Sequence, residues 1–287
     1  MSTDSSLDNL VEQARKGNEQ ALEAVVRAIQ DRIYNLALRM LWHPSDAEDA
    51  TQEILVKVIT HLSQFRQESA FMTWVYQISK NHLLTTRRRH AETTPLSFSF
   101  IGDVLEAEHL QAKPLVEDQD EVEQELLVKE IQLRCTLGML LCLDRDHRLA
   151  YILGEIFEVS SVQGASILGI RESAFRKRVS RARTRLQRCM EPNCSLVGET
   201  KECNCIRHLD RSSSTEKQKL VTLLVAHPLG ASVFQPDSLL LAQARELGEL
   251  ERVAAIFRSH PFFASPERLV LAIKNLLASE TFRIFEM

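Results

Sequence analysis

Glycine and proline are scarce in this chain, with 9 and 8 copies among 287 residues. Because these two residues form many turns, their scarcity favours helices and excludes collagen-like or linker-like sequences. The chain contains no run of 18 consecutive apolar residues, and its N-terminus, MSTDSSLDNL, lacks an apolar signal core. We therefore expect a cytoplasmic protein without membrane insertion. A hydrophobic fraction of 44% is sufficient for folded cores.

Sequence motifs of catalysis are also missing. The chain has no G-x-x-x-x-G-K-[ST] phosphate loop, no G-x-G-x-x-G fingerprint, no H-E-x-x-H zinc pair and no G-x-S-x-G nucleophile elbow. Each of these motifs positions groups that bind a nucleotide, hold a metal or attack a substrate. We therefore expect that the protein is not an enzyme and requires no cofactor.

Charge is distributed very unevenly along the chain, although the net charge is only −4. Residues 91–130 contain eleven acidic and two basic residues, whereas residues 165–190 contain eight basic residues and one acidic residue. A smaller basic cluster, Arg87 to Arg89, precedes the acidic stretch. This pattern indicates two basic modules joined by an acidic tether. A basic run is also typical of a solvated helix face, so charge alone does not establish a nucleic-acid partner.

The first 90 residues have helical periodicity throughout. Asn18 is expected to cap a helix that runs to Leu41, and the sequence Ser45–Glu48 predicts a capping box for the next helix. Ser69 is expected to cap a fourth helix over residues 70–89. One face of that helix is apolar, and another mixes amides, hydroxyls and cations. A face of this composition suits contact with a nucleic-acid strand.

Two strings in this module, DAEDATQEILVKV (residues 46–58) and FRQESAFMTWVYQISKNHLL (residues 65–84), resemble region 2 of bacterial sigma factors of the extracytoplasmic-function group. The resemblance implies that the first, acidic helix docks on core RNA polymerase, with candidates Asp49, Gln52 and Glu53. It also implies that the second helix contacts the −10 promoter element. The candidate DNA-binding residues there are Lys80, Asn81, Arg87, Arg88 and Arg89.

A second module, near residues 125–190, has the pattern of a helix-turn-helix. Asp144 is expected to cap a helix over residues 145–157, and a short helix follows from Ser160 or Ser161 to Leu168. Gly169 then forms a tight turn before a basic helix over residues 172–189. In a helix-turn-helix the second helix enters the major groove of DNA. The outward side chains would be Arg176, Lys177, Ser180 and Arg183, with Arg171 and Ser173 at the N-terminal tip.

The string SSVQGASILGIRESAFRKRVSRARTRL (residues 160–186) resembles region 4 of the same sigma family, which recognises the −35 promoter element. The resemblance therefore assigns DNA binding to the six residues just named. The chain departs from the family at Asp144, where the family usually has proline, and at Arg171, where it often has serine or threonine. These departures leave the promoter sequence open.

Four cysteines and one histidine lie within twenty residues after this module: Cys189, Cys194, Cys203, Cys205 and His208. Their spacing matches no standard zinc finger. Three interpretations remain open: a zinc or copper site, a redox thiol switch, or no role. The metal-ligand candidates are Cys194, Cys203, Cys205 and His208, with Cys189 as a further candidate. Some sigma factors that resemble this chain carry a Cys-rich stretch after region 4, and some of those sense metals. Cys135 and Cys142 are interpreted as core residues.

These observations predict an all-α protein of two helical modules with a helical extension. The expected parts are a region 2 bundle (1–90), an acidic linker (91–124), a region 4 helix-turn-helix (125–190), a Cys-rich segment (191–214) and a C-terminal extension (215–287). The expected function is that of a sigma factor, which binds core RNA polymerase and promoter DNA and promotes initiation. An anti-sigma protein, or the extension itself, would regulate it. The alternative is a free-standing helix-turn-helix regulator with a metal- or redox-sensing Cys cluster.

Overall fold

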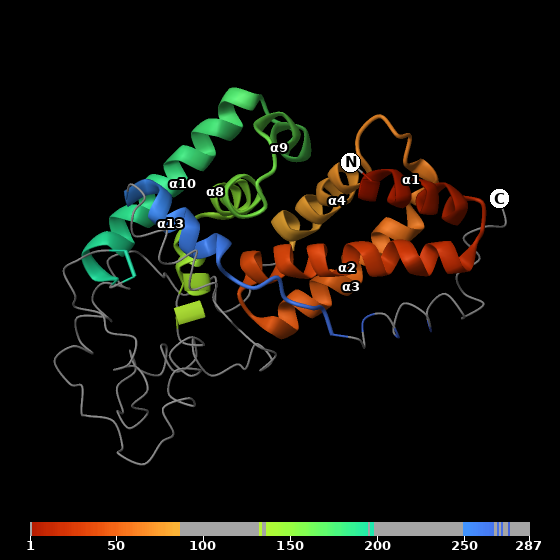
Figure 1. Cartoon of the computed structure of the whole chain (residues 1–287), viewed down its shortest axis with the longest axis horizontal. Helices are drawn as coiled ribbons and strands as arrows, with labels where there is room; N and C mark the ends of the chain where they lie inside the picture. The colour runs from red at the N-terminus through yellow and green to blue at the C-terminus, as the bar shows by residue number, and fades with distance from the viewer. Residues whose placement is uncertain are drawn as a thin grey trace, which may run out of the picture. The chain divides into compact units, whose positions relative to one another are not determined.

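The computed structural model describes residues 2–86, 132–133, 136–194, 196–197 and 249–266, together with positions 269, 271 and 275. Every regular element in these parts of the chain is a helix, which confirms the predicted all-α fold (Figure 1). The described residues form two compact units. Those within Met1–Arg87, Val162–Glu172 and Phe262–Met287 form the first, and those within Arg88–Ser161 and Ser173–Pro261 form the second. The predicted acidic linker lies outside the described residues.

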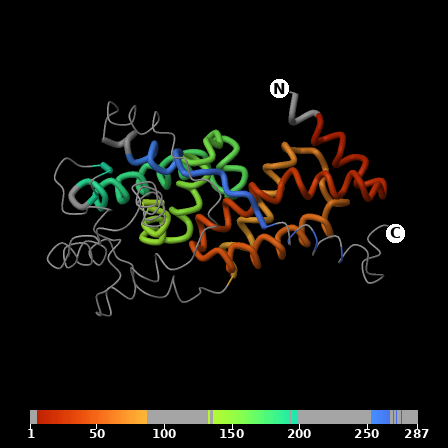
Figure 2. The backbone as a smooth tube through the Cα atoms, turned by 60° about the horizontal axis from the view of Figure 1, so that its bottom comes forward, coloured from red at the N-terminus to blue at the C-terminus, as the bar shows by residue number. Residues whose placement is uncertain are grey.

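The first unit is built around one long helix. Its N-terminal helices are α1 (Ser2–Arg15), α2 (Glu19–Leu41), α3 (Pro44–Thr60), the short η1 (Leu62–Gln64) and α4 (Phe71–Thr85). Nearly all of α9 (Ser161–Leu168) belongs to the same unit. Helix α2 packs against α1, α3 and α4 and supplies much of the apolar core (Figure 2). The predicted cap at its start is confirmed, because Asn18 Oδ1 accepts a hydrogen bond from Ala21 N at 3.0 Å.

Two other predicted caps are wrong. Helix α3 begins at Pro44 with His43 as its N-cap, so no capping box forms over Ser45–Glu48. Proline is well suited to the first helical position, because its fixed φ fits a helix and its missing N–H would have no helical partner there. Helix α4 follows Ala70 rather than Ser69, and Ala70 offers no side-chain oxygen to the first turn.

The described core of the second unit includes segments that are far apart in sequence. The helix α8 (Arg145–Tyr151) continues directly into a π-helical turn, η3 (Ile152–Ile156), and α13 (Glu249–Arg258) packs against that turn. Asp144 caps α8 as predicted, since its Oδ1 accepts a hydrogen bond from His147 N at 3.0 Å. The C-terminal extension therefore contributes to the packing of the second unit. No helix in the described part of the chain is long and apolar enough to span a bilayer.

Glycine is required at one point in this core. A Cβ atom on Gly154 of η3 would lie 3.0 Å from Val179 Cγ2 and 3.4 Å from Phe175 Cζ. Both neighbours belong to α10 (Glu172–Asn193), the basic helix. The missing side chain therefore lets the π-helical turn approach α10 closely.

Candidate nucleic-acid interface

The three polymerase-docking candidates lie together on the solvent side of α3. Asp49 and Glu53 are exposed and Gln52 is half-buried, while Ala50 and Ile54 of the same helix are buried. Residues three and four apart on a helix are surface neighbours, so the three polar side chains share one face. The structure thus brings together the residues that the sequence grouped.

A buried histidine lies beside this acidic face, and the sequence analysis did not single it out. His82 of α4 is 7% exposed, and its Nδ1 lies 2.8 Å from Lys57 Nζ and 3.7 Å from Glu53 Oε2. Burial lowers the pKa of His82, and the nearby Lys57 lowers it further against the opposing effect of Glu53. The unprotonated nitrogen of a neutral imidazole can accept a hydrogen bond from the Lys57 ammonium, so the pair joins α4 to α3 beside the docking face.

The −10 candidates that the structure describes lie on the second half of α4. Asn81 is exposed and Lys80 is half-buried. One turn earlier, Gln77 Nε2 donates a hydrogen bond to Ser166 O, 3.1 Å away in the same unit. Arg87, Arg88 and Arg89 lie outside the described residues, so the basic end of the predicted surface stays a prediction.

The helix-turn-helix elements occur at the predicted residues. Helix α9 (Ser161–Leu168) ends in a turn in which Ile170 N donates to Ala165 O at 3.1 Å. Gly169 in this turn has a φ of +67°, a left-handed conformation that glycine adopts without a steric cost. The basic helix α10 begins two residues after this turn, at Glu172, and continues four residues beyond the predicted end, to Asn193.

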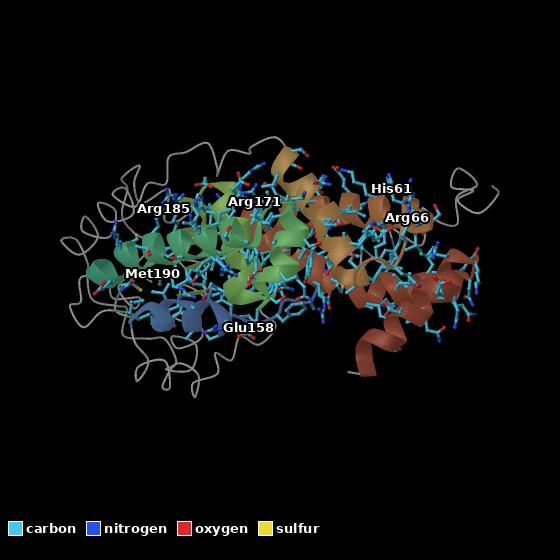
Figure 3. The ribbon with its side chains drawn as sticks, turned by 90° about the horizontal axis from the view of Figure 1, so that it is seen from above. His61, Arg66, Glu158, Arg171, Arg185 and Met190 are labelled. Atoms are coloured by element: carbon cyan, nitrogen blue, oxygen red, sulfur yellow. The ribbon has the colours of Figure 1, made fainter. Side chains whose placement is uncertain are left out.

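The basic helix has one apolar and one basic face. Phe175, Val179, Ala182 and Leu186 are buried. The predicted DNA-contact residues Arg176, Lys177 and Ser180 are exposed, as are Arg171 and Ser173 at the tip. Figure 3 shows Arg171 just before α10 and Arg185 farther along the helix.

Several arginines of α10 are held by acids of the second unit. Arg178 Nη1 lies 2.9 Å from Asp146 Oδ1, and Arg185 Nη1 lies 3.2 Å from Asp144 Oδ2. The DNA-contact candidate Arg183 forms an ion pair with Glu155 of η3, whose side chain is 9% exposed. These pairs neutralise part of the basic helix. Arg176 and Lys177 are exposed on the same helix.

Among the acids that pair with α10, Asp144 is the one whose ionised form is clearly stabilised by its contacts. Partial burial acts to raise the pKa of its carboxyl. The hydrogen bonds from His147 and Arg185 favour the ionised form and outweigh burial, so the pKa of Asp144 is lowered. One carboxylate thus caps α8 and holds an arginine of the basic helix.

Three described cysteines are thiols: Cys142, Cys189 and Cys194. Burial raises the pKa of Cys142 to about 12, with Cys189 adding to the effect, and it raises the pKa of Cys189 to about 12, with Cys194 adding. Cys142, interpreted from the sequence only as a core residue, thus lies close to the start of the predicted cluster. No group of three potential ligands suited to a metal occurs among the described residues. Cys203, Cys205 and His208 lie outside them.

Known proteins that are similar to this chain are RNA polymerase sigma factors. The family model for Sigma-70 region 2 matches residues 25–93. The chain is 28% identical over 198 residues to the RNA polymerase sigma-H factor of Pseudomonas aeruginosa, covering 67% of this chain and 97% of that protein. It is 29% identical over 188 residues to the ECF RNA polymerase sigma-E factor of Escherichia coli K12, covering 64% of this chain and 93% of that protein.

The matched segment includes the acidic face of α3 and the polar face of α4, and the relatives are matched over almost their whole length. About a third of this chain lies beyond those alignments. The family match and these relatives support the identification of this chain as a bacterial sigma factor of the extracytoplasmic-function type, which acts in transcription initiation.

Proposed function

We propose that this sigma factor docks on core RNA polymerase through α3 and contacts promoter DNA through α4 and α10. The observation that carries the proposal is the match of residues 25–93 to Sigma-70 region 2, because this segment contains every polymerase-docking and −10 candidate. The exposed carboxylates Asp49 and Glu53 are suited to a basic surface of the polymerase. The exposed amide of Asn81 can both donate to and accept from the edge of an unstacked base.

The second DNA contact is assigned to α10. Its exposed Arg176, Lys177 and Ser180 follow a helix-turn of the length used to place a recognition helix in the major groove. Arginine and lysine there can bind phosphates for affinity and guanine edges for specificity. We assign this helix to the −35 element.

In-vitro transcription with core polymerase over a promoter library tests the proposal. We expect discrete start sites whose promoters share a −10 and a −35 element, and no such transcripts from core polymerase alone. A free-standing operator-binding regulator would instead bind a DNA site without polymerase and yield no new transcripts. That result would refute the sigma function and favour the alternative.

Replacing Arg176 and Lys177 singly by alanine should weaken binding to −35 DNA. A lost phosphate contact should reduce the salt dependence of binding by about one unit, and a lost base contact should cost about 1–3 kcal/mol. Fluorescence anisotropy across a salt series measures both effects. Arg178→Ala is the matched control, since Asp146 already pairs with that guanidinium. Equal affinities for all three variants and the parent protein would contradict this assignment.

We also propose that the Cys-rich segment binds zinc or copper through Cys194, Cys203, Cys205 and His208, with Cys189 as a further candidate. Thiolates and imidazole are suitable ligands for both metals. Such sites often order their loop only when the metal is bound, so metal could control how the extension docks. A redox role for the same thiols is the competing proposal.

Elemental analysis of anaerobically purified protein should show near-stoichiometric zinc or copper. The double variant Cys203→Ser, Cys205→Ser should lose the metal, whereas Cys135→Ser should retain it. Metal-free parent protein that forms a reversible disulfide with oxidant would favour the redox switch. If the protein contains no metal and does not respond to oxidant, the segment has neither role.

A further inference from the structure

Three polar residues follow one another on one face of α2, at intervals of four residues: Asp31, Asn35 and Arg39. Asn35 is fully buried and Arg39 is 2% exposed. Burial lowers the pKa of Arg39 to about 10, so its guanidinium stays charged at neutral pH. Buried polar groups in a helix core need hydrogen-bond partners, and some of these partners come from the C-terminal extension.

The extension is held here mainly through its backbone. Asn35 Nδ2 donates to Phe263 O at 2.7 Å, and Phe263 N donates back to Asn35 Oδ1 at 3.1 Å. Ser265 N and Oγ donate to Asp31 Oδ1 at 2.9 Å and 2.6 Å. One amide side chain thus pairs with both polar groups of a single residue, as a neighbouring strand would. The contact lies within the first unit.

Arg39 contacts both the Asn35 amide and the Phe263 ring. Arg39 Nη1 donates to Asn35 Oδ1 at 2.7 Å, so the oxygen faces the guanidinium and the NH2 group faces Phe263 O. The Arg39 guanidinium also lies over the Phe263 ring, 5.7 Å from its centroid. The site therefore recognises an extended backbone with an aromatic residue two positions before a serine.

The preceding part of the extension is anchored in the second unit by different chemistry. Phe257 of α13 is fully buried and packs edge-on against Tyr151, with ring centroids 5.6 Å apart. His260 Nε2 and Thr136 Oγ1 share a buried hydrogen bond of 2.8 Å. Exposing a whole aromatic side chain to water is costly, whereas bonds to water can replace the part-buried hydrogen bonds at Asp31 and Asn35 at a smaller net cost.

We propose that residues 263–265 form a releasable latch. The latch binds the polar site of α2, and it follows helix α13, which is anchored in the second unit. The bound latch holds the sigma factor in a low-activity state. This rests on the proposed function, in which α4 and α10 contact promoter DNA. The occupant of the α2 site is this chain's own segment. A sigma factor must place α4 and α10 on one promoter. The extension binds in the unit that contains α4 and in the unit that contains most of α10, so it restricts the independent movement of these two helices. Releasing the latch should therefore raise activity.

Two full-length variants open the latch from opposite sides. Phe263→Pro removes the N–H that donates to Asn35 and the ring under Arg39, and Asp31→Ala removes the acceptor for Ser265. Phe262→Ala is the matched control, because Phe262 adjoins Phe263 in the sequence and its own side chain is 58% exposed. Hydrogen exchange measures the Ser265 amide, and in-vitro transcription with core polymerase measures activity. In both latch variants we expect exchange about tenfold faster, as for a locally opened segment, and severalfold more promoter-specific transcript.

The two measurements separate the possible failures. Unchanged Ser265 exchange in both variants would overturn the docking site itself. Faster exchange with unchanged or reduced transcription would overturn the restraint. If the parent protein directs no promoter-specific transcription at all, the sigma function fails and the restraint fails with it, while hydrogen exchange still decides whether the latch exists.

Discussion

The double variant Asp49→Lys, Glu53→Lys is expected to bind core RNA polymerase at least a hundredfold more weakly than the parent protein. Both carboxylates lie on the exposed face of α3, so the change alters the surface and not the core. Placing like charges together across an interface costs several kcal/mol, and about 1.4 kcal/mol corresponds to a tenfold change in affinity. Fluorescence-detected titration of labelled sigma factor with core polymerase measures the loss.

A second double variant, Glu19→Lys, Glu68→Lys, provides the matched control. It changes the net charge by the same amount at two exposed positions away from the α3 face. We expect it to bind core polymerase within a few-fold of the parent protein, because rim charges far from the contact act mainly through weak, screened attraction. Equal losses in the two double variants would show that net charge matters and that α3 is not the docking helix.

Local sequence chemistry predicted much of the helical fold. Asn18 and Asp144 cap their helices as predicted, since each supplies an oxygen directly before an apolar-periodic stretch. The prediction at Ser45 was wrong because proline at the first helical position competes with the four-residue capping box Ser45–Glu48. The sequence contains both signals, and only the local backbone geometry decides between them.

The contacts between distant segments could not be predicted in this way. The part-buried pair of Lys57 and His82 joins two helices, and Glu155 forms an ion pair with Arg183 in the second unit. Periodicity assigns a residue to a face of its own helix but does not identify the helix that faces it. The sequence therefore placed Arg183 among the DNA-contact residues without indicating its acidic partner.

The contact between the C-terminal extension and α2 could not be predicted from the sequence either. The sequence of the extension contains no motif that carries chemistry, and the polar face of Asp31, Asn35 and Arg39 resembles any solvated helix face. The structure shows instead that Asn35 is fully buried and bonded to Phe263. Buried polar residues on an otherwise apolar helix are the signal that points to this contact, and burial is visible only after the chain has folded.

The variant Asn81→Ala is expected to bind core polymerase normally and to open promoter DNA at least tenfold less efficiently. Asn81 is exposed on α4, and a lost side-chain contact to a base edge costs about 1–3 kcal/mol. Alanine has a higher helix propensity than asparagine, so the substitution should not unfold α4. Any loss of opening then reports a lost contact and not a damaged helix.

Permanganate footprinting of unpaired thymines measures the opening, and the polymerase titration described above measures docking. Asn9→Ala is the matched control, because it makes the same change at an exposed position of α1. We expect this control to open promoters as the parent protein does. Normal thymine reactivity with Asn81→Ala would remove Asn81 from the −10 contact. Parallel losses of docking and opening would instead place Asn81 in the polymerase interface, because a base contact made after docking cannot weaken the docking step itself.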